Sequence, residues 1–118
     1  MAQSDKIQIG VTKENNAVLE RIEEMGLFAK QHDIASFAMA YAIREGVMPG
    51  VVSNSDTKWH TKGLDPNGEM AAAVVALFPG VDAPYRAIES LINSGLQKLE
   101  REIDRQGTLD LSKYLPPQ

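Results

Sequence analysis

Ile34-Ala-Ser-Phe-Ala-Met-Ala-Tyr-Ala-Ile-Arg-Glu-Gly46 is the stretch around which this chain is organised. Its apolar residues follow the i, i+3, i+4, i+7, i+8 spacing of a buried helical stripe, occupied by Ile34, Phe37, Ala38, Tyr41 and Ala42. The alanines in this stretch are small enough to let a neighbouring helix approach closely. We therefore expect one central, buried helix that ends at Gly46.

Length and composition indicate one globular domain. The 118 residues are 43% hydrophobic and 24% charged, which suits a single modest core. Within one domain spanning 1–118, the pattern suggests a strand-helix-helix unit over 6–47, a helical pair over 65–106 and a tail over 107–118.

The charge balance is acidic throughout. The net charge is −4, with five Lys/Arg against seven Asp/Glu in residues 1–50 and seven against nine in residues 51–118. Neither half is therefore a basic module of the kind that holds nucleic acid by charge alone.

The chain has no cysteine, which excludes disulfides and thiolate metal sites. The first residues lack the apolar core of a signal peptide, and the longest apolar run, Met70–Phe78, is far shorter than the roughly 20 residues of a membrane span. We expect a soluble, cytoplasmic protein without membrane contact.

Residues 6–12 alternate like a strand with one buried face. Ile7, Ile9 and Val11 lie on one side, and Lys6, Gln8 and Gly10 lie on the other. A single strand needs a ladder partner, and no second strand of similar quality follows nearby. Two alternatives stay open: the same strand of a second subunit pairs with it in a homodimer, or the segment is an extended arm over the helices.

The next helix is expected over Lys13–Met25, with Thr12 as its N-cap and a stop at Gly26. Asp33 is the expected cap of the central helix. Residues 49–63 are rich in Ser, Asn, Asp, Thr and Gly and are predicted to form a loop.

Trp59 lies within this predicted loop, between Lys58 and His60 and close to Lys62. One interpretation is that the indole pins the connection onto the core. The other is that the ring stacks on a nucleic-acid base while the lysines contact the backbone.

The second half predicts two more helices. Asp65 should cap a helix over Glu69–Phe78 that is apolar nearly all round and should be well buried. Asp82 should cap a long helix. Its apolar stripe starts broad and ends close to a three-four repeat, which is typical of a helix that begins in the core and projects outward. Leu99 and Ile103 in its last turns, with Leu111 in the tail, are then candidates for a protein interface.

Signatures of catalysis are absent from the sequence. The only histidines, His32 and His60, are not spaced as a metal-binding pair, and no phosphate-binding glycine loop or activated serine motif is present. We expect a non-catalytic protein without metal or cofactor, and an enzyme with a dispersed carboxylate pair is the third and weakest alternative.

The order of alternating strand, cap, amphipathic helix, turn and second helix over Lys6–Val47 resembles the ribbon-helix-helix pattern of DNA-binding repressors. That resemblance implies a strand paired across a dimer, with its polar face in the major groove. Carried over by position, Lys6, Gln8 and Gly10 would face the bases.

The segment from Gly26-Leu-Phe28 through Asp33 to Gly46 is also similar to small helical proteins encoded with DNA phosphorothioation systems of the Dnd type. This similarity implies an accessory role in DNA modification or phage restriction. No catalytic residue carries over from it.

The sequence thus predicts a mainly α, four-helix domain with a short N-terminal strand, assembling as a dimer or larger oligomer. The leading function is a non-catalytic, DNA-associated regulatory or defence-accessory protein that uses Lys6, Gln8 and Lys13, with Lys58, Trp59, His60 and Lys62 as a second surface. The alternative is a structural subunit of a larger complex, whose partner would contact Ile7, Ile9, Leu99, Ile103 and Leu111.

Overall fold

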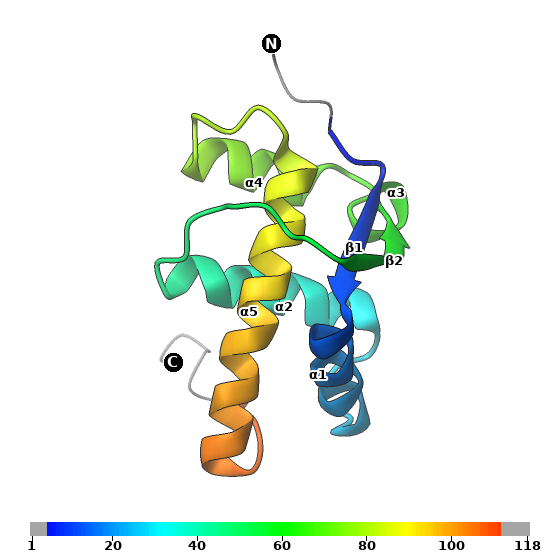
Figure 1. The fold of residues 1–118 in the computed structure, drawn as a ribbon, viewed down its shortest axis with the longest axis vertical. Coiled ribbons are helices and arrows are strands. Elements are labelled where there is room, and N and C mark those ends of the chain that lie inside the picture. The colour runs from blue at the N-terminus through cyan, green and yellow to red at the C-terminus, as the bar shows by residue number, and fades with distance from the viewer. Residues whose placement is uncertain (1–4, 112–118) are drawn as a thin grey trace.

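The computed structural model describes residues 5–111, and these fold into helices packed around a small sheet (Figure 1). The elements in chain order are β1 (Gln8–Thr12), α1 (Lys13–Glu24), α2 (Gln31–Arg44), β2 (Ser55–His60), α3 (Thr61–Leu64), α4 (Glu69–Leu77) and α5 (Pro84–Gln106). The mainly helical class with an N-terminal strand is confirmed, and the short helix α3 and the strand β2 are additions.

The long helix α5 forms the centre, and α2 crosses it (Figure 1). At the crossing, a Cβ atom on Gly95 would lie only 1.9 Å from the backbone oxygen of Ala38. The two backbones therefore touch where the sequence offers a glycine and an alanine, as the small residues of α2 predict. Ile34, Ala38 and Ala42 are buried in this contact region.

The start of α2 differs from the prediction. Its N-cap is Lys30, which makes no side-chain cap hydrogen bond, and Asp33 lies in the first turn instead. A carboxylate at that place still faces the positive end of the helix dipole, which explains why the residue resembles a cap in the sequence.

Residues 49–63 are not only a loop, because they contain β2, which pairs antiparallel with β1. Ile9 lies opposite Trp59 and Gly10 opposite Thr57, so Lys58 is an extra residue in a β-bulge. The loop prediction was wrong here because β2 buries one large side chain, Trp59, and its remaining residues are polar or small. An alternating apolar pattern is therefore missing.

The other edge of β1 is hydrogen-bonded to α5. The Glu89 carboxylate accepts from the Gly10 amide at 2.7 Å, and the Asn93 side chain accepts from the Thr12 amide at 3.1 Å and donates to the Gly10 carbonyl at 3.1 Å. β1 thus has partners on both edges within one chain. Pairing with the same strand of a second subunit is therefore not required. The segment is also not an unpaired arm laid over the helices.

Helix α4 is much less buried than its composition predicts. Met70 and Val74 face the core, whereas Val75 and Leu77 are 47% and 55% exposed. Its start follows the prediction in part, since the Asp65 carboxylate accepts from the Met70 and Ala71 amides although the N-cap position is Gly68.

Helix α5 begins differently from expectation, whereas it ends before Gly107 as the sequence predicts. Its N-cap is Ala83, not Asp82, and the Tyr85 and Arg86 amides donate to the carboxylate of Asp5 in the N-terminal segment. After Gly107, which has the left-handed φ of 82°, Leu109 returns to the core.

Leu99 and Ile103 are 0% and 1% exposed, so the last turns of α5 do not project from the body. Helix α1 packs against α5, and an ion pair joins Arg21 of α1 to Asp104 in the last turns of α5. Residues 112–118, which hold the rest of the predicted tail, lie outside the described residues. Among the described residues, no helix is both long and apolar enough to cross a membrane.

Candidate nucleic-acid surface

The strands β1 and β2 form a two-stranded antiparallel ribbon with one apolar and one polar face. Ile9 and Trp59, which lie opposite each other, are buried against the helices. Opposite residues share a face of the sheet, and side chains two apart do so as well. Gln8, Thr57 and His60 therefore lie together on the outer face, where all three are exposed.

One hydrogen bond ties this outer face together, because the Thr57 hydroxyl donates to the Gln8 side-chain oxygen at 3.3 Å. His60 is held from the other side, since its Nδ1 accepts from the Lys62 amide at 3.2 Å and caps the short helix α3. Local structure thus fixes two polar side chains from β2 and one from β1 on the same surface.

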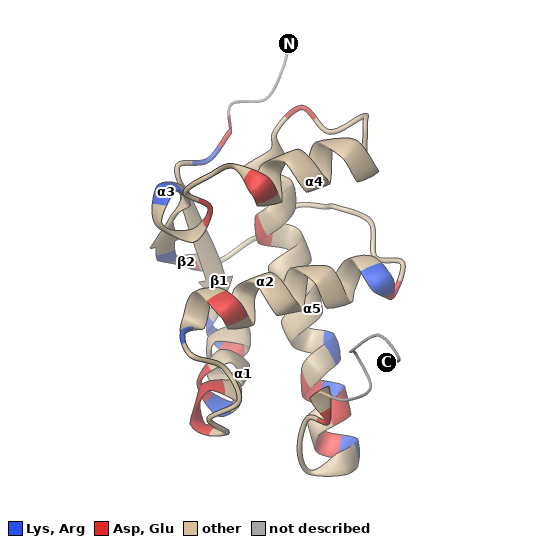
Figure 2. Cartoon of the chain, turned by 180° about the vertical axis from the view of Figure 1, so that it is seen from behind, with Lys and Arg blue, Asp and Glu red and all other residues tan. Residues whose placement is uncertain are grey.

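Three lysines belong to the ribbon or to the elements that follow its strands. Lys13 begins α1, Lys58 is the bulge residue of β2, and Lys62 belongs to α3. Figure 2 shows blue Lys or Arg positions at β2 and α3. Lys13 and Lys58 line one hollow of about 240 Å³, which also contacts Asp56. None of the three lysines forms an ion pair with a described residue. The fold therefore brings Lys13 and Lys58, which are 45 residues apart in sequence, to the same hollow.

Two residues predicted for this surface have other roles. Lys6 pairs with the buried Glu89, with 2.6 Å between its Nζ and a carboxylate oxygen, so its charge is neutralised within the chain. Trp59 is only 7% exposed and packs edge-to-face on His32, with ring centroids 6.4 Å apart. The interpretation that the indole pins the connection onto the core is correct, and no ring face is open for stacking.

A second hollow, of about 330 Å³, lies over the ribbon next to the start of α5. Lys6 and Arg86 contribute positive charge to its lining and Asp5 contributes negative charge. The Ser55 hydroxyl lies 3.5 Å from the Glu89 carboxylate beneath it. With Glu89 included, the charges around this hollow balance, whereas the hollow lined by Lys13 and Lys58 has one carboxylate, Asp56, for two lysines.

Sequence reasoning missed the two polar residues that fix β1 to α5. Glu89 and Asn93 are 1% and 5% exposed and lie within the apolar stripe of the long helix. Their spacing of four residues places them on one helix face, next to Ile88 and Ile92. A buried acid and amide interrupting an apolar stripe are the signal that could have revealed a backbone partner.

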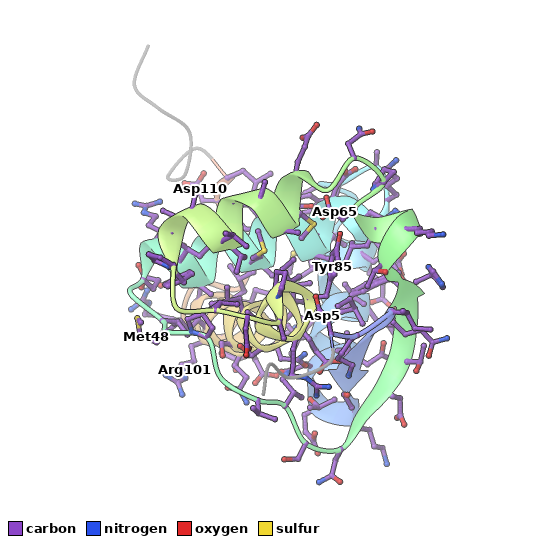
Figure 3. All side chains as sticks on the ribbon, turned by 90° about the horizontal axis from the view of Figure 1, so that it is seen from above. Asp5, Met48, Asp65, Tyr85, Arg101 and Asp110 are labelled. Carbon is purple, nitrogen blue, oxygen red and sulfur yellow. The ribbon has the colours of Figure 1, made fainter. Side chains whose placement is uncertain are left out.

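At the start of α5, Tyr85 lies between two carboxylates, Asp65 and Asp5, as Figure 3 shows. Burial raises the pKa of the Tyr85 hydroxyl, and its 3.0 Å hydrogen bond to Asp65 and the charges of Asp65 and Asp5 raise the pKa further. The phenol therefore stays protonated and donates a structural hydrogen bond that joins α5 to the start of α4.

The residues proposed for a protein interface are mostly internal. Ile9, Leu99 and Ile103 are buried in the core of the chain itself and present no surface to a partner in this structure. Leu111 is half-buried, and Ile7 is 70% exposed. Only Ile7 is thus freely accessible.

No group of three or more metal-ligating His, Cys, Asp or Glu side chains occurs among residues 5–111. The chemistry that the described surface offers is hydrogen bonding from Gln8, Thr57 and His60, with positive charge from the adjacent lysines. No protein-family model matches this chain, and neither does any curated protein or solved structure.

Proposed function

We propose that the protein is a non-catalytic, DNA-associated protein that contacts duplex DNA with the β1–β2 ribbon. The observation that carries this proposal is the ribbon's exposed polar face, together with Lys13, Lys58 and Lys62, which form no ion pair within residues 5–111. A two-stranded antiparallel ribbon has the dimensions of the major groove, and its outward side chains can reach base edges.

The lysines and the polar side chains of this surface would contact different parts of the DNA. Lys13, Lys58 and Lys62 would contact phosphates, which position a protein without reading sequence. The Gln8 amide nitrogen would donate to base acceptors, because its oxygen already accepts from Thr57. A set of only three phosphate contacts fits the acidic balance of the chain, since affinity would be modest.

The proposal differs from the ribbon-helix-helix arrangement in one respect. There the two strands come from two subunits, whereas here β1 and β2 of a single chain supply both. One chain would therefore present a complete ribbon. Lys6 and Gly10 would not read bases, because Lys6 pairs with Glu89 and Gly10 has no side chain.

The test is the salt dependence of binding to a mixed-sequence duplex, followed by fluorescence anisotropy. Three phosphate contacts predict a slope of about −2.7 in log affinity against log salt, or about 40-fold weaker binding at 200 mM than at 50 mM salt. The triple variant Lys13→Gln, Lys58→Gln, Lys62→Gln should lose this dependence.

The matched control is the triple variant Lys30→Gln, Lys98→Gln, Arg101→Gln, which also removes three positive charges, at the start of α2 and on α5, outside the surface. It should leave the slope unchanged. Absence of binding by the intact chain, or equal binding by the triple variant and the control, would overturn the proposal.

A protein-interaction subunit is the second candidate, and the exposed side of α4 is the observation that favours it. Val75 and Leu77 are aliphatic side chains about half open to solvent on a helix with few charges. Binding through such a face would be insensitive to salt and would weaken in Leu77→Ser. The same salt titration therefore separates the two functions.

A further inference from the structure

The connection from α2 to β2 passes in front of α5 (Figure 1), and a hollow of about 280 Å³ lies between them. The hollow is lined by this connection, the start of α1 and the middle of α5. The described residues that line it carry amide, hydroxyl and aliphatic side chains, and none of them is charged. The hollow differs in this respect from the two hollows beside the ribbon, which are lined by lysine and aspartate.

The side chain of Asn93, which is 5% exposed, lies at the base of this hollow. Its oxygen accepts from the Thr12 amide at 3.1 Å and from the Asn15 side-chain nitrogen at 2.9 Å. Its nitrogen donates to the backbone carbonyls of Gly10 and Glu89 at 3.1 and 2.8 Å. Because a carbonyl can only accept and a backbone amide can only donate, these four bonds fix the orientation of the Asn93 side chain. They also occupy both of its polar atoms.

The Asn15 side chain has one polar atom left over. It is 2% exposed, and it turns its nitrogen toward Asn93 because the Asn93 oxygen can only accept. The Asn15 oxygen accepts no hydrogen bond from any residue between 5 and 111, yet it is not sealed from solvent. Amide oxygens of such buried side chains normally have a partner. The fold therefore holds a hydrogen-bond acceptor ready in a residue that lines the hollow.

Two hydroxyl groups in the lining supply donors. The Thr12 hydroxyl accepts from the Asn15 amide at 3.2 Å, and its proton goes to no described residue. The Ser94 hydroxyl is half-buried and forms no hydrogen bond within the part of the chain that the structure describes. Ser90 differs, because its hydroxyl donates to a backbone carbonyl and accepts from the Gly50 amide. Thr12 and Ser94 are therefore the hydroxyls open to a ligand.

The rim on the side of the connection is aliphatic. Met48 and Val51 both line the hollow and are 70% and 73% exposed. The connection is held against α5 between these two residues, since the Gly50 amide donates to the Ser90 hydroxyl at 2.8 Å. Side chains this exposed would lose contact with water when a ligand with C–H groups fills the hollow, which favours binding.

We propose that this hollow binds a neutral, polyhydroxylated ring of the size of a monosaccharide. A hydroxyl group both donates and accepts, so a ring that carries several can bond to the Asn15 oxygen and to the Thr12 and Ser94 hydroxyls together. The C–H groups of the ring would contact Met48 and Val51.

Charge and size favour this class of ligand over others. A charged ligand would give up its hydration without meeting an opposite charge in the lining. The volume lies just below the roughly 300–1,000 Å³ of pockets for drug-sized ligands, which suits a single small ring. The proposal does not rest on DNA binding, since Lys13, Lys58 and Lys62 do not line this hollow.

The test is a titration of the labelled chain with D-ribose, D-glucose, D-galactose and myo-inositol, each into the range of tens of millimolar, followed by NMR. At least one of these probes should give saturable shifts at the side-chain amide of Asn15 and the backbone amide of Ser94. D-glucuronate and D-galacturonate, which add a carboxylate to the same rings, should bind at least about tenfold more weakly than the neutral probe that binds. The absence of saturable shifts with every probe would overturn the proposal, as would equal binding of the uronates.

Two variants locate the site. Asn15→Ala removes the acceptor and should weaken binding about threefold to tenfold, as expected for one neutral hydrogen bond. Ser94→Leu fills the hollow without removing a partner of Asn93 and should abolish saturable binding. The matched control is Asn16→Ala, which makes the same change one residue away, in the lining of a different hollow. It should bind the probe like the intact chain.

Circular dichroism of each variant checks that the fold is retained, and Ser94→Leu decides the test if Asn15→Ala does not fold. Unchanged binding in Ser94→Leu would overturn the proposal. A control that binds as weakly as Asn15→Ala would do the same.

Discussion

Helices α2 and α4 are both rich in alanine and aliphatic residues, yet α2 is largely buried and α4 is largely exposed. α2 lies across the centre of the molecule, and its stripe is buried except at Phe37, which is partly buried. α4 is apolar almost all round but buries only Met70 and Val74. The difference is that α2 carries its apolar residues at a helical period next to small residues, so α5 can approach it closely. A helix with high apolar content but without such a pattern is therefore not necessarily buried in the core.

The largest effect is expected where the two central helices touch. In Gly95→Val, the new side chain would collide with the Ala38 backbone, which cannot move aside as a flexible side chain would. We expect a loss of more than about 3 kcal/mol in the free energy of unfolding, at the upper end of overpacking effects. Urea unfolding followed by circular dichroism measures it, and a stability equal to that of the intact chain would show that α2 and α5 do not cross so closely.

Truncation within the α2 stripe should have the next largest effect. Ile34 is 1% exposed, so Ile34→Ala should lower the free energy of unfolding by about 3 kcal/mol through lost burial and a cavity. Its counterpart in α4 is Val75→Ala, which should change stability by less than about 0.5 kcal/mol. Equal losses in the two variants would contradict the contrast between the helices.

The polar link between α5 and β1 should contribute less than the α2 core. Glu89→Gln removes the charge that pairs with Lys6 while keeping the shape of the side chain. We expect a loss of about 2 kcal/mol, because the amide cannot accept as strongly from Lys6 and the Gly10 amide. Hydrogen exchange should then speed up at Gly10 and Thr12, whereas unchanged exchange at both amides would refute the link.

The smallest effect is expected on the exposed side of α4. Leu77→Ser replaces a side chain that is 55% exposed, so the free energy of unfolding should stay within about 0.5 kcal/mol of the original. A marked loss of stability would mean that α4 is held in the core more firmly than the structure indicates.

The sequence predicted the regular helices closely. The helix after the strand was expected over Lys13–Met25 and spans Lys13–Glu24, and the one expected over Glu69–Phe78 spans Glu69–Leu77. Thr12 caps the first of these with a hydrogen bond from the Asn15 amide, as predicted. These predictions succeed because capping and helical periodicity are local properties of the chain.

Partners distant in sequence could not be predicted in the same way. The strand β2 has no apolar alternation, and its existence depends on pairing with β1, more than 40 residues away. Asp5 caps α5, and Glu89 bonds Gly10, across about 80 residues. Lys13 and Lys58 line one hollow, and their role in binding nucleic acid stays a prediction. The neutralisation of Lys6 depends on Glu89, which is distant in sequence.

The central claim is that the β1–β2 ribbon, and not the exposed side of α4, is the binding surface. Amide NMR shifts of the labelled chain, recorded as duplex DNA is added at low salt, test it most directly. We expect changes at Gln8, Thr57, Lys58 and Lys62 that vanish at high salt, with the amide shifts of Val75 and Leu77 unchanged. Shifts confined to α4, or no shifts at any DNA concentration, would contradict it.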